Sequence, residues 1–234
     1  MAGMITFNGI PISSIAPVMI EDIRVSPIAL NPVARERAVQ GGAEFVRMRD
    51  GSRTVSITFA LLEDDPVVRA AHLEHLRTWA KRDKEYPLMI YTVPGKYLTA
   101  VCTGFPEPSI RQWWESKLRI TFTCFDNPYW TSLAERSVPC GTAFVALGDA
   151  PPLMRIEHIQ TAASALTYSL DGRTMTFSQV PSGNLVIDLN RQTAAVDALS
   201  IMSTYTFTSR FLIPRTGTQT ITGTGTVKFR ERWV

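Results

Sequence analysis

Two segments in the first half of the chain alternate strictly between apolar and other residues. Every second residue is apolar in 55–61 and in 118–124, and most residues between them are Ser, Thr or Arg. An alternation of period two places the apolar side chains on one face of an extended strand, so both segments are predicted strands. The turn signal Pro94-Gly95 predicts a further hairpin. Additional strands are predicted for residues 5–10, 20–28, 86–92 and 97–104.

One amphipathic helix is predicted for residues 66–84. Carboxylates at 63–65 precede Pro66, and both features are favoured at the start of a helix. Val68, Leu76 and Trp79 then recur at helical spacing, whereas charged residues lie between them. This apolar stripe predicts that the helix packs on the strands of the first half.

The alternation is lost between Leu30 and Arg53. Arginines outnumber acidic residues in this segment, and Gly41-Gly42 lies near its middle. A connection of this length in a compact domain is usually functional or disordered. The segment is therefore expected to be a projecting loop or hairpin arm, and the alternative is a mobile surface loop. Its arginines are Arg35, Arg37, Arg47, Arg49 and Arg53.

The strand that ends at Cys124 is followed by a predicted bend. Proline cannot donate to a sheet ladder and disfavours helix at the residue before it. The chain is therefore expected to turn between two domains, at residues 1–137 and 138–234, with 131–152 resembling a linker because it is rich in Pro and Gly. The bend consists of Asp126, Asn127, Pro128, Tyr129 and Trp130.

The second domain is predicted to consist of strands. Segments 166–170 and 174–177 flank Asp171-Gly172, which is typical of a hairpin turn. The spacing between successive strands indicates a β-sandwich, so the whole chain is expected to be mainly β. The remaining predicted strands are 154–159, 185–189, 205–213, 219–222 and 226–232.

Composition restricts the function classes. The chain has 234 residues, of which 45% are apolar and 19% charged, as in folded domains. The net charge of +3 is dispersed, which does not favour a nucleic-acid surface. No membrane-spanning segment or signal peptide is evident, so assembly in the cytoplasm is expected. Cys102, Cys124 and Cys140 are widely spaced and are expected to be buried free thiols.

Candidate catalytic chemistry is sparse. His72 and His75 are spaced like metal ligands on a helix, but two ligands are too few for a site. No nucleophile elbow or phosphate-binding loop occurs, and the carboxylate pairs are adjacent in sequence. No enzyme activity, cofactor or metal is therefore expected. Aromatic residues of the second domain that could stack on sugars are Tyr168, Phe177, Tyr205, Phe207 and Trp233.

Several short motifs occur in a recognisable order. Phe7-Asn8-Gly9 is followed by the arginine-bearing arm, by Gly51-Ser52-Arg53 before a strand, and by Leu76-x-x-Trp79 in the helix. Later come Pro94-Gly95-Lys96-Tyr97-Leu98-x-Ala100 and Ile120-Thr-Phe-x-Cys-x-Asp-x-Pro-Tyr129. In this order the motifs resemble the distal tail protein (Dit) family of long-tailed, non-contractile bacteriophages, although one residue, Asn127, is inserted into the family's usual Asp-Pro-Tyr.

The resemblance implies a structural role. It implies an N-terminal split β-barrel with one helix, which closes into a homohexameric ring, and a C-terminal sandwich similar to galectins or carbohydrate modules. The arm, at about 31–53, would reach the neighbouring subunit through its arginines. The ring would join the tail tube protein to a tail-associated hub or lysin protein, and to receptor-binding proteins, at the distal end of the virion's tail. The alternative hypothesis is a carbohydrate-binding adsorption module that acts through the C-terminal sandwich.

Overall fold

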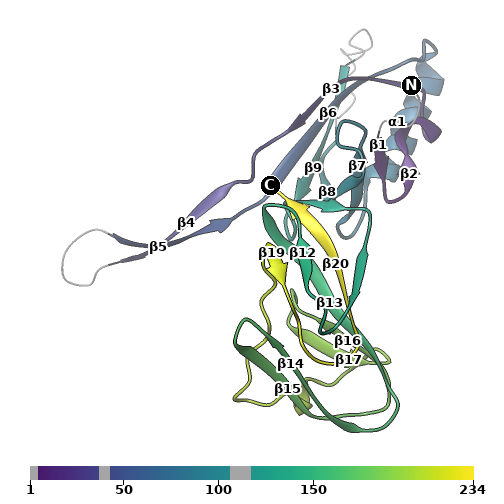
Figure 1. The fold of residues 1–234 in the computed structure, drawn as a ribbon. Coiled ribbons are helices and arrows are strands. Elements are labelled where there is room, and N and C mark those ends of the chain that lie inside the picture. Colours follow the sequence, from purple (N-terminus) through teal and green to yellow (C-terminus); the bar gives the residue numbers. More distant parts are fainter. Residues whose placement is uncertain (1–4, 37–42, 106–116) are drawn as a thin grey trace. The chain divides into compact units, whose positions relative to one another are not determined.

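The computed structural model describes residues 5–36, 43–105 and 117–234, and the chain divides into two compact units (Figure 1). Met1–Trp130 together with Val234 form the first unit, and Thr131–Trp233 form the second. The division therefore falls after residue 130 rather than after residue 137. The reason is that β11 (Arg136–Pro139) pairs with β20 (Thr226–Trp233), which makes this segment part of the second unit.

The described part of the chain is mainly β with one α-helix. In the first unit, antiparallel strands are joined in the order β2–β1–β7–β8–β9–β6–β3. Residues 12–14 form a short 3-10 helix after β2. These strands are β1 (Ile5–Phe7), β2 (Ile10–Pro11), β3 (Val18–Val25), β6 (Arg53–Leu61), β7 (Tyr86–Ile90), β8 (Lys96–Gly104) and β9 (Lys117–Cys124).

The helix α1 (Pro66–Ala80) begins where the sequence predicted. Asp65 is its N-cap, and its carboxylate accepts hydrogen bonds from the amides of Val67 at 2.8 Å and Val68 at 3.3 Å. The helix ends four residues before the predicted Lys84, because Lys81 has extended backbone angles. The guanidinium of Arg82 donates to the carbonyl oxygen of Thr78 at 2.8 Å and so satisfies the end of the helix.

Three aromatic rings form the centre of the first unit. Phe7 lies 4.9 Å from Phe122 and 5.8 Å from Trp79 between ring centroids. The indole N–H of Trp79 donates to the carbonyl oxygen of Ile10 at 3.0 Å. Trp79 and Leu76 are buried as the helical stripe predicted, whereas Val68 is 40% exposed, so only the second half of the helix covers the core.

The second unit combines a larger antiparallel sheet with two short two-stranded ladders. The sheet order is β18–β17–β16–β13–β20–β11, and the ladders are β14–β15 and β12–β19. Their buried apolar side chains form one core that includes Tyr168, Phe177 and Phe229. The strands not yet given are β12 (Phe144–Ala146), β13 (Ala150–Gln160), β14 (Ser164–Leu170), β15 (Arg173–Val180), β16 (Gly183–Asp188), β17 (Thr193–Val196), β18 (Leu199–Ser200) and β19 (Gly217–Gln219), with β10 (Trp130–Ser132) at the division.

Two predictions for this half are wrong. Residues 131–152 are not a linker, because they contain β11 and β12, and because Phe144 and Ala146 are buried. Residues 205–213 do not form a strand: they follow a short 3-10 helix, Met202–Thr204, and run irregularly beside β15. Their apolar residues Phe211 and Leu212 are partly or wholly buried without belonging to a strand.

A charge network stabilises the surface of the second unit. One carboxylate oxygen of Glu157 accepts from Arg155 Nε at 2.6 Å, and the other lies 2.6 Å from Lys228 Nζ. Glu135 accepts two further hydrogen bonds from Arg155, at 2.8 and 2.9 Å. The hydrogen bonds from Lys228 and Arg155 lower the pKa of Glu157 below its ordinary value of 4.5.

The network predicts acid-dependent stability. Because the folded pKa of Glu157 lies below 4.5, its contribution is fully present above that value and is lost as pH falls through the folded pKa. Glu157→Gln should therefore lower the melting temperature near neutral pH and have little effect in strong acid. Thermal unfolding across pH measures this, and two parallel melting curves would contradict it.

A second prediction concerns a close backbone approach. Gly225 has φ +99°, and a Cβ built there would lie 2.4 Å from the carbonyl oxygen of Glu157. Gly141 also has a left-handed φ of +87°, but a Cβ there meets nothing within 4 Å. We expect Gly141→Ala to lose about 1 kcal/mol of unfolding free energy, and Gly225→Ala at least about 2 kcal/mol, in urea denaturation. Equal losses would show that the close approach is unimportant.

Candidate functional site

The segment that lost the alternation forms a hairpin of two strands, β4 (Leu30–Glu36) and β5 (Ala43–Asp50). These strands pair with each other and make a separate two-stranded sheet (Figure 1). The sequence predicted either a projecting loop or a hairpin arm for this segment, and the structure shows a hairpin. Its large apolar side chains are more than half exposed: Leu30 61%, Phe45 60%, Val46 55% and Met48 53%.

The pairing register separates the hairpin side chains into two faces. Pro32 pairs with Met48 and Val33 with Arg47, after which a bulge makes Ala34 pair with Phe45. The bulge places Phe45 on the same face as Met48, because paired residues share a face and neighbours alternate. The apolar residues of this face are Leu30, Pro32, Ala34, Phe45 and Met48, and the face also carries Asp50, which pairs with Leu30.

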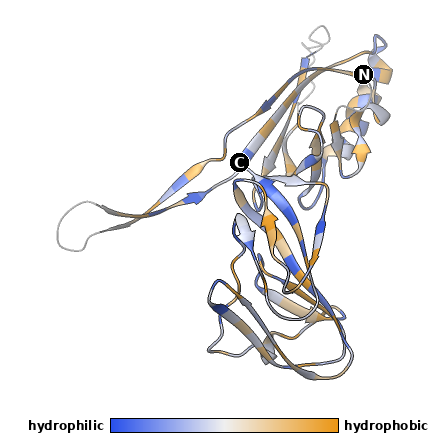
Figure 2. Ribbon diagram, viewed as in Figure 1, coloured by the Kyte–Doolittle hydropathy of each residue, from blue (hydrophilic) through white to orange (hydrophobic). Residues whose placement is uncertain are grey.

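The opposite face of the hairpin is basic and polar. Arg47 pairs with Val33, and Arg49 pairs with Asn31. Both arginines are exposed. Figure 2 shows hydrophobic and hydrophilic residues along the same two strands. The hairpin is therefore amphipathic, although the unit that carries it leaves both faces uncovered.

The base of the hairpin is tied to the rest of the first unit. The Gly51 amide donates to the carbonyl oxygen of Ala29 at 2.6 Å, and the Ala29 amide donates to that of Ser52 at 3.0 Å. The hydroxyl of Tyr129 donates to the carboxylate of Asp50, the last residue of β5. This hydrogen bond brings the predicted bend and the predicted arm together.

The five predicted arm arginines do not share one environment. Arg47 and Arg49 are exposed on the hairpin, and the backbone of Arg35 lies in β4. Arg37 lies outside the described residues. Arg53 does not belong to the arm: it begins β6, pairs in register with Cys124, and is only 4% exposed. The sequence did not predict the apolar face of the hairpin. Its apolar residues are visible in the sequence, but the bulge that brings them onto one face is not.

The bend follows directly after β9. The amides of Phe125 and Asp126 both donate to the carboxylate of Glu85, which holds the start of the turn. Asn127 is 9% exposed and Trp130 is 8% exposed. Both of these side chains are therefore buried rather than free in solvent.

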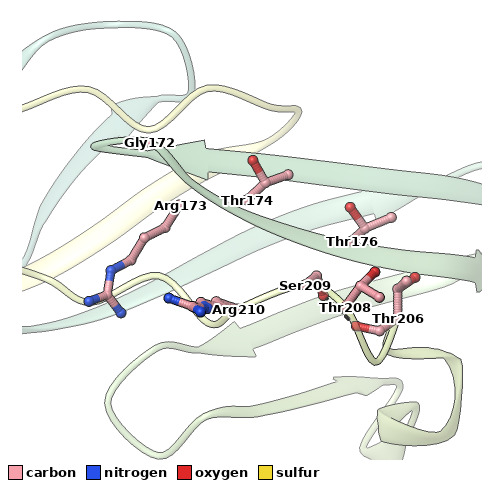
Figure 3. A pocket seen from close by; sticks show the side chains of 8 residues that line it. All are labelled: Gly172, Arg173, Thr174, Thr176, Thr206, Thr208, Ser209 and Arg210. Atoms are coloured by element: carbon pink, nitrogen blue, oxygen red, sulfur yellow. Dashed lines mark hydrogen bonds between the residues drawn. The ribbon is translucent and has the colours of Figure 1, made fainter.

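The second unit contains a separate pocket of about 430 Å³ (Figure 3). It lies between β15 and the irregular segment that the sequence predicted as a strand. Of the predicted sugar-stacking residues, Tyr168 and Phe177 are fully buried, whereas Phe207 is 100% exposed. The eight lining residues are Gly172, Arg173, Thr174, Thr176, Thr206, Thr208, Ser209 and Arg210.

The remaining candidate chemistry forms no metal site within the described residues. His72 and His75 have ring centroids 6.5 Å apart, and no group of three or more His, Cys, Asp or Glu side chains there could hold a metal ion. All three cysteines are free, but only Cys124 is fully buried. Burial raises the pKa of Cys124 to about 12, which keeps its thiol protonated and unreactive.

No helix within the described ranges is long and apolar enough to cross a membrane. No family model matches the chain, and no curated protein matches its sequence. Solved structures do match it over nearly its whole length, and they come from the hub and baseplate of bacteriophage tails.

The chain superposes with a TM-score of 0.76 on the crystal structure of SPP1 Dit (gp 19.1). That protein is described as a paradigm of the hub adsorption apparatus in phages that infect Gram-positive bacteria. The match covers 99% of both chains at 15% identity. The activated phage P2 baseplate with Ca matches with a TM-score of 0.50 over 94% of this chain and 92% of that chain, at 10% identity. The chain is therefore Dit-like in fold, which confirms the resemblance found in its motifs.

Proposed function

We propose that this protein is a structural, non-enzymatic component of a bacteriophage tail tip, and that six copies form a ring. The observation that carries the proposal is the likeness to SPP1 Dit across 99% of both chains. A likeness over both units favours a common architecture rather than one shared domain. In this proposal the first unit is the split β-barrel that builds the ring, and the second is a galectin-like sandwich outside it.

The amphipathic hairpin supplies the contact between subunits. An isolated two-stranded hairpin is marginally stable in water, and one with exposed Leu30, Phe45 and Met48 has apolar area left to bury. A neighbouring copy would cover the apolar face, while Arg47 and Arg49 would pair with its carboxylates and fix the register. In this proposal the hairpin contacts a different surface of its neighbour, so the contact is heterologous, and such contacts close into a ring when the rotation per subunit is right.

The segment Asp126–Trp130 is proposed as the bend between the units. Pro128 restricts the backbone, and Tyr129 connects this bend to the base of the hairpin through Asp50. The proposed partners are a tail tube protein, a tail-associated hub or lysin protein, and receptor-binding proteins, in a long-tailed, non-contractile phage. The proposed location is the distal end of the tail, after assembly in the host cytoplasm.

The hairpin assignment predicts which substitutions prevent assembly. Phe45→Ser with Met48→Ser should raise the concentration needed for half-assembly at least about tenfold, because each apolar side chain contributes roughly 2 kcal/mol when buried. Arg47→Ser with Arg49→Ser should weaken assembly less than the apolar pair of substitutions does. The effect of the arginine pair should be larger at low salt than at high salt. Neither pair should change the melting temperature of the monomer, since these side chains are exposed.

Light scattering across a concentration series measures the effect, first with the chain alone and then after addition of tail tube protein. Wild type should reach the mass of six 26.0 kDa chains. The control is Val67→Ser, because Val67 is 78% exposed on α1 and lies outside the hairpin. A wild-type chain that stays monomeric in both settings, or hairpin variants that assemble as well as the control, would refute the proposal.

A further inference from the structure

The pocket of the second unit is built by backbone hydrogen bonds between two segments. The amide of Thr206 donates to the carbonyl oxygen of Thr176, and that of Arg210 donates to the carbonyl oxygen of Thr174, each at 2.9 Å. The irregular segment is thereby held alongside β15. Thr174 and Thr176 are two residues apart and project from the same face of the strand, opposite the buried side chain of Met175.

Hydroxyl groups line most of this pocket. They come from Thr174 and Thr176 on β15 and from Thr206, Thr208 and Ser209 on the opposing segment (Figure 3). The Ser209 hydroxyl donates to the carbonyl oxygen of Thr206 at 2.7 Å, so its lone pairs stay available. Hydroxyls both donate and accept hydrogen bonds, which matches the hydroxyl groups of a sugar or polyol.

Two guanidinium groups lie at one end of the pocket. Figure 3 shows Arg173 and Arg210 near the Gly172 turn, away from Thr206 and Thr208. None of the eight lining residues is acidic. Within the described residues, Arg173 and Arg210 form no ion pair with an acidic side chain. Asp171 at the same turn faces Arg215 instead, with 3.5 Å between its Oδ2 and Arg215 Nη1. A guanidinium binds phosphate or carboxylate through two parallel hydrogen bonds.

A fully exposed aromatic ring belongs to the same segment. Phe207 is 100% exposed and lies in sequence between Thr206 and Thr208, which both line the pocket. In contrast, Tyr205 is held against Phe211, with ring centroids 4.9 Å apart. Neither ring lines the pocket, so its lining is made of polar side chains and Gly172.

We propose that this pocket binds an anionic glycan, meaning a sugar or polyol that carries phosphate or carboxylate groups. Arg173 and Arg210 bind the anionic group, and the Thr and Ser hydroxyls bind the ligand's hydroxyls. The volume of about 430 Å³ lies within the range of sites for small ligands. Such binding is independent of ring formation, since all these residues belong to the second unit.

Titration calorimetry on the full chain tests this inference. The probes are poly(glycerol phosphate), polygalacturonate and neutral dextran, each at low and high salt. We expect one of the two anionic polymers to bind more tightly than dextran, and salt to weaken that binding. Binding of poly(glycerol phosphate) identifies a phosphate ligand, and binding of polygalacturonate identifies a carboxylate ligand.

Variants then locate the site. Arg173→Gln with Arg210→Gln should weaken binding at least about tenfold. The matched control is Arg191→Gln, because Arg191 is an exposed arginine of the same unit that does not line the pocket. Unchanged melting temperatures establish that the variants fold. The proposal is overturned if neither anionic polymer binds, if dextran binds equally well, or if the double arginine variant binds like the control.

Discussion

A two-stranded hairpin has no second layer of its own to cover an apolar face, and this constraint governs the interpretation of the whole chain. The hairpin of β4 and β5 exposes Leu30, Phe45 and Met48 on one face and Arg47 and Arg49 on the other. Two paired strands alone are marginal in water. The proposed subunit interface would cover this apolar area and add to the stability of the hairpin.

The bulge in the hairpin decides on which face Phe45 lies. Without the extra residue, Phe45 would lie on the basic face beside Arg47, because strict alternation assigns odd-numbered positions of β5 to one side. The shift between the Val33 and Ala34 pairs moves Phe45 onto the apolar face. The base of the hairpin is held separately by Asp50 and Tyr129. The hairpin is thus attached to the first unit at its base, while its apolar side chains stay exposed.

Features that depend on neighbouring residues could be predicted from the sequence, whereas features that depend on distant segments could not. The helix start at Asp65-Pro66 and the strand at 118–124 depend on neighbouring residues, and both are found in the structure. The helix ends four residues before the predicted Lys84 because Lys81 has extended backbone angles, which the apolar stripe does not signal. Residues 205–213 are spaced like a further strand of a sandwich but only run beside β15, and burial of Arg53 depends on pairing with a segment about seventy residues away. The pocket, built by the same irregular segment, could not be predicted for that reason.

The central claim is that the apolar face of the hairpin lies against another copy of the chain. A photo-crosslinking benzophenone amino acid introduced at position 45 tests it most directly, because a reactive group there can only label what covers that face. Irradiation of assembled protein should produce covalent ladders of two to six chains, each linked from position 45 to the first unit of a neighbour. Monomers only, in a sample that light scattering shows to be assembled, would contradict the account.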